Sequence, residues 1–534
     1  MERYVKAAIR LSLFLFVLTP SISSGARLQP SDLVYQGAFR LPDDFNWGAR
    51  GISYYPPGNS GAGSLLVTGF EALTDGYAEY GEVSIPTPQQ EANWEDFPMA
   101  GFLRPLTPFD GQLILDYPVE YAFVSGIQYV PRQGSQTRDK IYGSLSAWYA
   151  EGEFGDDSFP TIWFSNLNGS GARGLFYVGP QSQTAPYHGR KMGEYLFTVP
   201  QWYADAHLGG RTLVTGRARG TPVGSDPITT SGGSQGPTLF ACQPSQIDNP
   251  ASNSGLDALP LLYYRAAYPG CAGPDIGANG EDVDCDYEFS DQVYRMCDAW
   301  SGAGFVESGS KRAILIIGQK SSTNCYYCGD PVDDDECPYA TTPPECATYY
   351  CNESRGYHCG PYERQVIFYD VDELGENVSS ATPWTVLPYT IWRPSGFYLK
   401  NDSQGNVCGD VGGMAVDPTG GRLFMVERGL GGTHSNAAVV HVWNFSSSSC
   451  PPCSGDEVTL NVPFPAGKTC ECVATVSITI GSGVVIPCNA TVTFRAPLVT
   501  IRPGVTIENG AVVHIRQQDP EIVSHRGTKP QRKE

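Results

Sequence analysis

The chain has 534 residues, only 17% of them charged, and a formal net charge of −21. Residues 27–453 carry −24 of that charge, because residues 1–26 carry +2, residues 454–517 balance and residues 518–534 carry +1. An acidic surface repels phosphate backbones and anionic lipids, so we expect no nucleic-acid partner. The length exceeds one ordinary domain.

The N-terminus has the pattern of a secretory signal. Arg3, Lys6 and Arg10 precede an apolar run over residues 11–18, and small residues follow at 24–26. We therefore expect residues 1–26 to be a signal peptide that is cleaved near Gly25–Ala26. No other apolar run approaches ~18 residues, so no transmembrane segment is expected. The sequence predicts a secreted protein, extracellular or periplasmic.

A phrase of glycine, alternating apolar residues and proline recurs along residues 27–449. "GISYYPPG" starts at Gly51, "GIQYVPRQG" at Gly126 and "GMAVDPTG" at Gly413, and two further short strands follow each phrase. The alternation and the turns predict antiparallel meanders, with one short helix in "PQWYADAHLGG" at 200–210. Such sheets avoid long open edges when they repeat around an axis. We expect an all-β fold with a β-propeller of five or six blades, closed by pairing of residues 33–42 with "VVHVWNF".

Residues 271–360 are rich in cysteine, glycine and proline and are expected to form an insertion on one blade. In an exported protein the sixteen cysteines favour disulfides, with zinc as the weaker alternative. Eleven cysteines lie in residues 27–449 and five in 450–534, so complete pairing predicts a bridge between the two parts. Cys408, Cys450 and Cys453 are the expected partners in that bridge.

Two acidic stretches in the same region are candidate calcium loops. "PDIGANGEDVDCD" starts at Pro274 and "DPVDDDEC" at Asp330. Carboxylate oxygens spaced by glycine can wrap calcium, with Asp282, Asp284 and Asp334 as the candidate ligands. Solvated acidic loops are the alternative.

The chain repeats itself near its C-terminus. Residues 477–496 and 498–517 share 8 of 20 positions at a spacing of 21, and both alternate apolar with polar residues. A fixed period near 20 residues predicts stacked coils, so residues 450–517 are expected to form a small β-solenoid-like domain. Residues 518–534 are expected to be a disordered tail.

Two resemblances accompany these patterns. "YQGAFRLP", "GEYLFTVPQWYADAHLGGRTLVTGRARG", "RQVIFYDVDEL" and "GGMAVDPTGGRLFMVERG" resemble a family of exported bacterial propeller-like proteins. The resemblance implies the fold and transfers no catalytic residue. Residues 455–517 resemble the bacterial module called the 3-coathanger stack, which implies an accessory role.

Candidate site residues come from the loops at one mouth of the expected channel. Glu71 and Glu427 end the second strands of the first and last meanders, where paired carboxylates could serve glycoside cleavage or lyase chemistry. Arg428 and Arg217 could join them, and Trp148, Tyr149 and Trp300 could stack on sugar rings. The alternative reading is that the charged residues cap strands and the aromatic residues fill the core.

These observations favour an exported binding or surface-interaction protein without a catalytic motif, with glycans or cell-surface components as partners. No cofactor other than calcium is expected. A carbohydrate-active propeller enzyme that uses Glu71 and Glu427 is the alternative, and a structural component of the envelope or matrix is the third reading. The ligand and the oligomeric state are left open.

Overall fold

The fold comes from a computed structural model that describes most of residues 26–445 and 453–517. The longer gaps in this description are residues 71–76, 116–121, 148–159, 180–191, 219–235, 245–250, 264–297, 322–325, 329–355, 395–409 and 431–436. Shorter gaps of one to four residues occur elsewhere.

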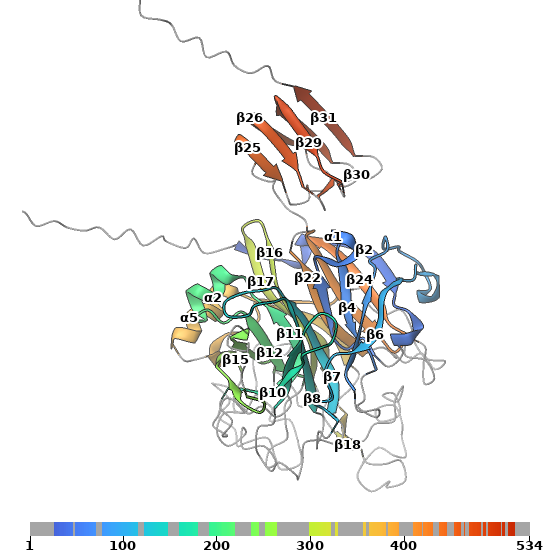
Figure 1. The fold of residues 1–534 in the computed structure, drawn as a ribbon, viewed down its shortest axis with the longest axis vertical. Coiled ribbons are helices and arrows are strands. Elements are labelled where there is room, and N and C mark those ends of the chain that lie inside the picture. Colours follow the sequence, from blue (N-terminus) through green and yellow to red (C-terminus); the bar gives the residue numbers. More distant parts are fainter. Residues whose placement is uncertain are drawn as a thin grey trace, which may run out of the picture.

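Five antiparallel sheets stand around one axis, which makes residues 26–445 a five-bladed β-propeller (Figure 1). Blade 1 contains β3 (Ile52–Tyr55), β4 (Ser64–Thr68), β5 (Glu79–Val83) and β6 (Phe102–Pro108). Blade 2 contains β7 (Ala122–Val130), β8 (Lys140–Ala147), β9 (Ile162–Ser165) and β10 (Arg173–Val178), with β14 (Gly255–Leu256) beside β10. Blade 3 contains β11 (Met192–Thr198), β12 (Leu213–Arg217), β13 (Leu239–Cys242) and β15 (Ala258–Leu262).

The remaining two blades use strands from both ends of this region. Blade 4 contains β16 (Ala299–Ser308), β17 (Lys311–Ser321), β20 (Tyr362–Tyr369) and β21 (Thr390–Trp392), and β1 (Ala26–Arg27) adds a short parallel strand to β17. Blade 5 contains β22 (Asp410–Asp417), β23 (Arg422–Arg428), β24 (Val439–Phe445) and β2 (Leu33–Arg40). A separate hairpin pairs β18 (Tyr326–Cys328) with β19 (Gly356–His358). The all-β propeller expected from the sequence is confirmed, with five blades.

Strand β17 shows why these residues form blade strands. Ala313, Leu315 and Ile317 pack between blades 4 and 5, whereas Ile314 and Ile316 pack between blades 3 and 4. Because both faces of the sheet are covered by neighbouring blades, the strand reads as a continuous run of branched apolar residues, which favour extended backbone.

The ring is closed by the first long strand of the chain. β2 pairs antiparallel with β24, from Leu33 opposite Phe445 to Arg40 opposite Val439. The predicted closure by residues 33–42 is therefore confirmed. The last blade is built from both ends of the propeller sequence, so opening the ring requires breaking a full ladder.

Helices are few and short in the described residues. The predicted helix at 200–210 is confirmed as α2 (Gln201–His207), and α5 (Val371–Ser380) follows β20, where the sequence predicted no helix. α1 (Gly58–Gly61) is a single turn, and short 3-10 turns lie at Pro30–Asp32, Asp43–Phe45, Trp94–Asp96 and Pro383–Thr385. None of the helices in the described part of the chain combines the length and apolarity needed to cross a membrane.

The repeated glycines lie where the inner strands of adjacent blades meet. A Cβ added to Gly51 would lie 2.5 Å from the carbonyl oxygen of Ser125, and one on Gly413 would lie 2.9 Å from that of Arg50. Gly302 in β16 has the same close approach, 2.6 Å from the backbone nitrogen of Met414. A side chain at these positions would push the inner strands apart. The glycine of the repeated sequence is therefore required for close packing of adjacent blades.

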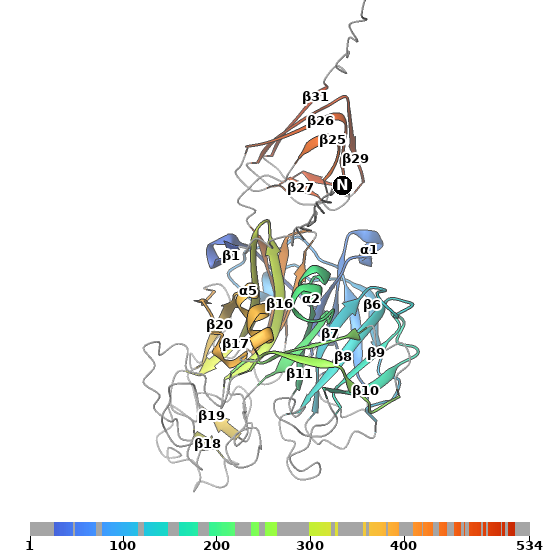
Figure 2. The ribbon, with the colours of Figure 1, turned by 90° about the vertical axis from the view of Figure 1, so that its left-hand side faces the viewer.

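The C-terminal segment (residues 453–517) contains parallel strands that pair among themselves. They are β25 (Ser454–Leu460), β26 (Thr469–Ile480), β27 (Val485–Ile486), β28 (Thr491–Ala496), β29 (Leu498–Ile501), β30 (Thr506–Ile507) and β31 (Val512–Gln517). β26 pairs with β29, β27 with β30 and β28 with β31, each at an offset of 21 residues. Figure 2 shows the strands as three sides of a triangle. The sequence period is therefore the spacing between hydrogen-bonded neighbours.

Two expectations about the cysteines and the insertion need correction. Cys453 forms a disulfide with Cys472 inside the C-terminal segment, so it does not bridge to the propeller. Cys242 is a free, buried thiol, which removes the premise of complete pairing. The range 271–360 is not one insertion, because β16 and β17 are the two strands of blade 4 nearest the propeller axis. Cys408 and Cys450 lie outside the described residues.

Candidate functional site

Each blade has one inner strand beside the propeller axis, and each inner strand contacts those of the two neighbouring blades. In order around the axis, these strands are β3, β7, β11, β16 and β22. Four of them are bulged at the same level, and Arg50 lies two residues before the start of the fifth, β3. A bulge takes a residue out of the ladder and redirects its side chain. We call the five residues at this level the inner ring: Arg50, Ser125, Glu194, Ser301 and Gly412.

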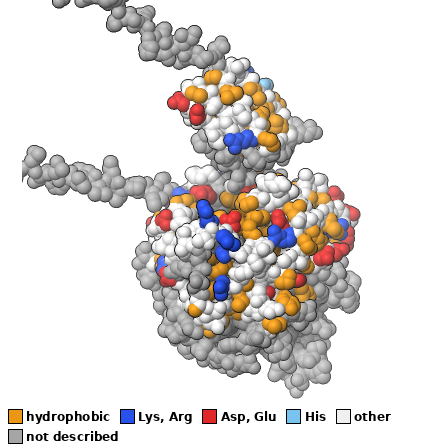
Figure 3. All heavy atoms as spheres, viewed as in Figure 1, with side chains coloured by type: hydrophobic (Ala, Val, Ile, Leu, Met, Phe, Trp, Pro, Cys, Tyr) orange, Lys and Arg blue, Asp and Glu red, His pale blue; other side chains and the backbone are white. Residues whose placement is uncertain are grey.

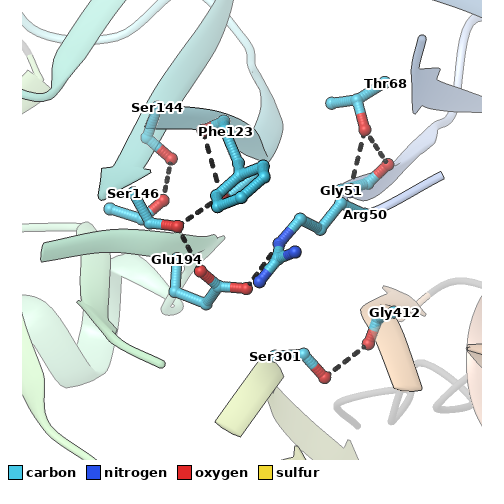
Figure 4. Close-up of polar contacts among 11 residues, drawn as sticks. Arg50, Gly51, Thr68, Phe123, Ser144, Ser146, Glu194, Ser301 and Gly412 are labelled. Carbon is cyan, nitrogen blue, oxygen red and sulfur yellow. Dashed lines mark hydrogen bonds and ion pairs between the residues drawn. The ribbon is translucent and has the colours of Figure 1, made fainter. Parts of the chain in front are cut away.

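An ion pair in the inner ring joins two blades that are not neighbours. Nε of Arg50 in blade 1 lies 2.9 Å from Oε1 of Glu194 in blade 3, and the Glu194 side chain is fully buried (Figure 4). Ser146 of blade 2 donates its hydroxyl to the other carboxylate oxygen at 2.5 Å. The Arg50 guanidinium also lies over the Phe123 ring, 5.0 Å from its centroid. The buried carboxylate is thus satisfied by groups from two other blades, as a buried charge requires.

Hydroxyl groups continue this network around the axis. Ser125 and Ser146 are 2.7 Å apart at their oxygens, so a chain of hydrogen bonds runs from blade 2 to Glu194. Ser301 of blade 4 donates to the backbone oxygen of Gly412 in blade 5 at 3.0 Å. These contacts hold inner strands of different blades together.

Four of the sequence-predicted residues lie at one face of the propeller. Inner strands begin and second strands end at this face, since Met192 at the start of β11 pairs with Arg217 at the end of β12. Trp300 is the second residue of β16 and lies beside Arg217, because its backbone nitrogen donates to the oxygen of Ala218 at 2.7 Å. We call this the start face. Glu427 and Arg428 lie there too, at the end of β23.

Glu427 is held inside blade 5 by a hydrogen-bonded chain. Its Oε2 lies 3.0 Å from Nε2 of His441, and Nδ1 of the same ring lies 2.9 Å from the hydroxyl of Tyr35. Glu427 and His441 are both buried. Burial raises the pKa of Tyr35, and the Glu427 carboxylate raises it further, so the phenol stays protonated. The chain connects three strands, β23, β24 and the closing strand β2.

The other candidates at the start face are buried. The Trp300 side chain is fully buried in the core between blades 3 and 4, so no sugar can stack on it there. Arg217 and Arg428 are buried as well. A second buried ion pair lies nearby in blade 4, where Nζ of Lys320 is 2.9 Å from Asp298. For these positions the structure agrees with the alternative reading of core and strand-end residues.

The remaining candidates lie outside the described residues: Glu71, Trp148, Tyr149, Asp282, Asp284 and Asp334. Within the part that is described, no group of three or more histidine, cysteine or acidic residues is arranged to hold a metal. Calcium at the acidic loops therefore stays a prediction. The described thiol, Cys242, has a pKa raised to about 12 by burial, so it is unreactive.

Two further residues of the start face, which the sequence did not predict, are exposed aromatics. Phe70 and Tyr77 lie in the connection between β4 and β5 and are 40% and 41% exposed. Gly69, directly before Phe70, approaches the chain next to the inner ring: a Cβ on Gly48 would lie 2.3 Å from its oxygen. A signal for Phe70 was present in the sequence: it follows the second strand of its meander, as Trp148 follows the equivalent strand of blade 2.

The inner ring was also missed from sequence. Arg50, Ser125 and Gly412 each stand one residue before a repeated glycine, and Ser301 precedes Gly302 in a phrase that lacks the proline. Glu194 has no such marker, because Tyr195 replaces the glycine in blade 3. The residue before the glycine was the available signal.

Comparison with known proteins gives no family. No family model matches the chain, and no curated protein matches it. Among solved structures, a chain of "Chaetomium thermophilum Polycomb Repressive Complex 2 bound to GSK126" is 10% identical, with 77% of this chain and 98% of that chain covered and a TM-score of 0.26. A likeness at that level carries no argument about this protein.

Proposed function

We propose that the protein is an exported binding protein that acts through the start face of its propeller without catalysis. The observation that carries the proposal is that the carboxylates described at this face are bonded inside the fold, whereas two aromatic rings are exposed to solvent. Glu194 and Glu427 are each hydrogen-bonded within the fold, whereas Phe70 and Tyr77 present aromatic surface to solvent. Export itself rests on the N-terminal sequence pattern.

Carbohydrate is the ligand class that we propose for this face. The CH faces of sugar rings pack on aromatic planes, and polar rims supply the hydrogen bonds that orient them. Of the large hydrophobic residues exposed on the described part of the propeller, the aromatic ones are Phe70 and Tyr77, and the others are aliphatic. Trp148 and Tyr149, which follow β8 in the sequence and lie outside the described residues, belong to the same proposal.

The C-terminal segment is proposed to be the accessory part of this architecture. The offset of 21 residues in its parallel pairings supports the stacked-coil, solenoid-like assignment and the likeness to the 3-coathanger stack. Calcium bound by Asp282, Asp284 and Asp334, and glycans or other cell-surface components as partners, are parts of the same proposal. A structural role in the envelope or matrix is the weaker reading, and fully soluble protein in the medium after cell fractionation would contradict it.

A glycan array followed by calorimetry tests the binding proposal. We expect binding to at least one glycan class, and Phe70→Ala or Tyr77→Ala should weaken it about tenfold or more. Leu103→Ala is the matched control, because Leu103 is 44% exposed but lies on β6 at the outer edge of blade 1. Equal affinity in all three variants would contradict the assignment of this face.

The alternative is a carbohydrate-active enzyme that uses Glu71 and Glu427. The buried position of Glu427 at the start face, hydrogen-bonded to His441, is the observation in its favour, since buried carboxyls serve as general acids. A hydrolysis and lyase screen separates the two. Turnover that Glu427→Gln abolishes while the fold is retained would reject the binding-only proposal.

A further inference from the structure

The two ends of the C-terminal segment are covered differently. At the N-terminal end, β25 buries its inward residues Val458 and Leu460, and Phe464 packs edge-on against Phe494 with ring centroids 5.7 Å apart. The Cys453–Cys472 disulfide ties β25 to β26 at the same end. This end is closed by the chain itself.

The opposite end exposes the residues that should be inside. In the terminal repeat (residues 498–517), Ile501, Ile507 and Ile515 are 43%, 49% and 52% exposed. Their register partners one repeat earlier, Ile480, Ile486 and Phe494, are at most 1% exposed. The side chains point the same way in both repeats, so the difference arises because the described chain places no strand beyond the terminal repeat. Figure 3 shows hydrophobic atoms gathered on the side of this segment where β29 and β31 lie.

The backbone at this end is open as well. Among the described residues, β29 pairs with β26 alone and β31 with β28 alone, which leaves one edge of each without a ladder. Proteins usually protect such edges with lysine, proline or a charge that points inward. β29 reads "LVTI" and β31 reads "VVHIRQ", and neither has a lysine, a proline or an inward charge. The edge therefore has the features of a pairing surface.

Charge favours contact through this end rather than through the propeller. The terminal repeat contains Arg502, Arg516 and Glu508, for a formal charge of +1, in a chain of net charge −21. Two acidic propellers repel one another, whereas two terminal repeats carry little charge. A second copy of the chain can thus approach here with the least electrostatic cost.

We propose that two copies of the chain associate end to end through their terminal repeats, with β31 of each copy paired antiparallel to β31 of the other. Pairing about a two-fold axis at His514 places Val513 opposite Ile515 of the second copy and Arg516 opposite Val512. In this register, inward apolar residues face one another and no two arginines are opposite each other. Both features stabilise pairing between antiparallel strands. The association would join two propellers and their ligand sites, which raises avidity for a multivalent surface.

The oligomeric state of the full secreted chain tests this proposal. By sedimentation, we expect a dimer at about 10 µM for the wild-type chain, and Ile515→Lys should raise the dissociation constant about tenfold or more, because it puts a charge into the apolar contact. Val476→Lys is the matched control, since Val476 is 50% exposed on β26, inside the segment rather than at its end. Circular dichroism should show both variants folded.

Two results would overturn the proposal. A wild-type chain that stays monomeric at about 100 µM would show that this end is covered by its own chain or reserved for a different protein. An equal loss of dimer in Ile515→Lys and Val476→Lys would place the contact elsewhere.

The register has a separate test. His514→Cys should form a covalent dimer on a non-reducing gel, because residues facing one another in an antiparallel pair lie at disulfide distance. Thr493→Cys is the control, since Thr493 is the register partner of His514 one repeat inward. Covalent dimer from Thr493→Cys but not from His514→Cys would refute this pairing.

Discussion

At the scale of single residues, buried polar groups of the propeller find their partners on another blade or on another strand of the same blade. Arg50 and Glu194 face one another across blade 2, and His441 connects Tyr35 to Glu427 within blade 5. Such groups contribute little when intact, because both partners lose hydration, but removing one partner leaves a buried charge. Individual substitutions in these networks should therefore have large effects.

Glu194→Gln should lower the free energy of unfolding by about 3 kcal/mol or more, since it removes the buried carboxylate that pairs with the Arg50 guanidinium, whose side chain is only 12% exposed. The measurement is urea unfolding followed by fluorescence. Glu363→Gln is the matched control, because the Glu363–Arg393 pair is 46% and 41% exposed, and exposed pairs contribute about 0–1 kcal/mol. Comparable losses in both variants would contradict the role assigned to the inner ring.

Buried phenols should make the fold sensitive to alkali. Burial raises the pKa of Tyr54 and of Tyr80 to about 12, whereas an unfolded tyrosine titrates near 10. The unfolded chain loses these protons first, so the contribution to stability is complete below about pH 10 and is lost as the pH rises toward 12. Urea midpoints at pH 8, 9.5 and 11 measure this. A smaller decrease is expected in Tyr80→Phe, and an unchanged midpoint at pH 11 in the wild type would disprove the prediction.

At the scale of elements, close backbone approach between blades limits which residues the inner strands can contain. The outer strands are limited mainly by hydrogen-bond pairing within their own sheet. Gly51 and Gly302 lie against the backbone of the next blade, which no side chain could do. Strand β6, at the outer edge of blade 1, carries Pro105 and Pro108, which suit a strand with one free edge. Tolerance to substitution should therefore rise from the axis outward.

Gly51→Ala and Gly302→Ala should each destabilise the protein by about 1–3 kcal/mol, because the added methyl group would lie within 2.6 Å of a neighbouring strand. Gly101→Ala is the control, since its added Cβ would lie 3.6 Å from the Ser84 hydroxyl, an ordinary contact. Thermal unfolding followed by circular dichroism compares the three. Stability equal to wild type in Gly302→Ala would contradict the inner-strand packing.

At the scale of the whole molecule, the closed propeller ring and the C-terminal segment are structurally separate parts. β2 is required for blade 5, whereas the strands of residues 453–517 pair only with one another in the described chain. The propeller core extends through every blade interface, and the C-terminal strands have their own core. The two parts should therefore respond differently to truncation.

A chain that begins at Leu41 should fail to fold cooperatively, because it lacks the closing strand and leaves the edge of β24 that pairs with β2 without a ladder. A chain that ends at Phe445 keeps every blade and should retain a cooperative transition. Yield, circular dichroism and urea unfolding of the two chains provide the comparison. A cooperative transition in the chain without β2 would show that ring closure is not needed for stability.

The sequence by itself determined the all-β class, the propeller, its closure by residues 33–42 and the period of the C-terminal strands. Two sequence patterns indicate these features: the alternation of apolar and polar residues along each strand, and the repeated glycines. Both patterns reflect only contacts between neighbouring residues of a strand or between two adjacent strands. Blade 4 was the hardest to predict, because β16 has glycines in place of branched residues and lies among cysteine-rich sequence.

Only the tertiary structure decided which polar residues meet. Arg50 and Glu194 are 144 residues apart, and Tyr35 and His441 are 406 apart, so no spacing in the sequence connects them. The same holds for exposure: Trp300 and Phe70 are both aromatic residues beside a strand end, yet one fills an interface between blades and the other faces solvent. Burial depends on what the other blades place against a residue, and that is fixed when the ring closes.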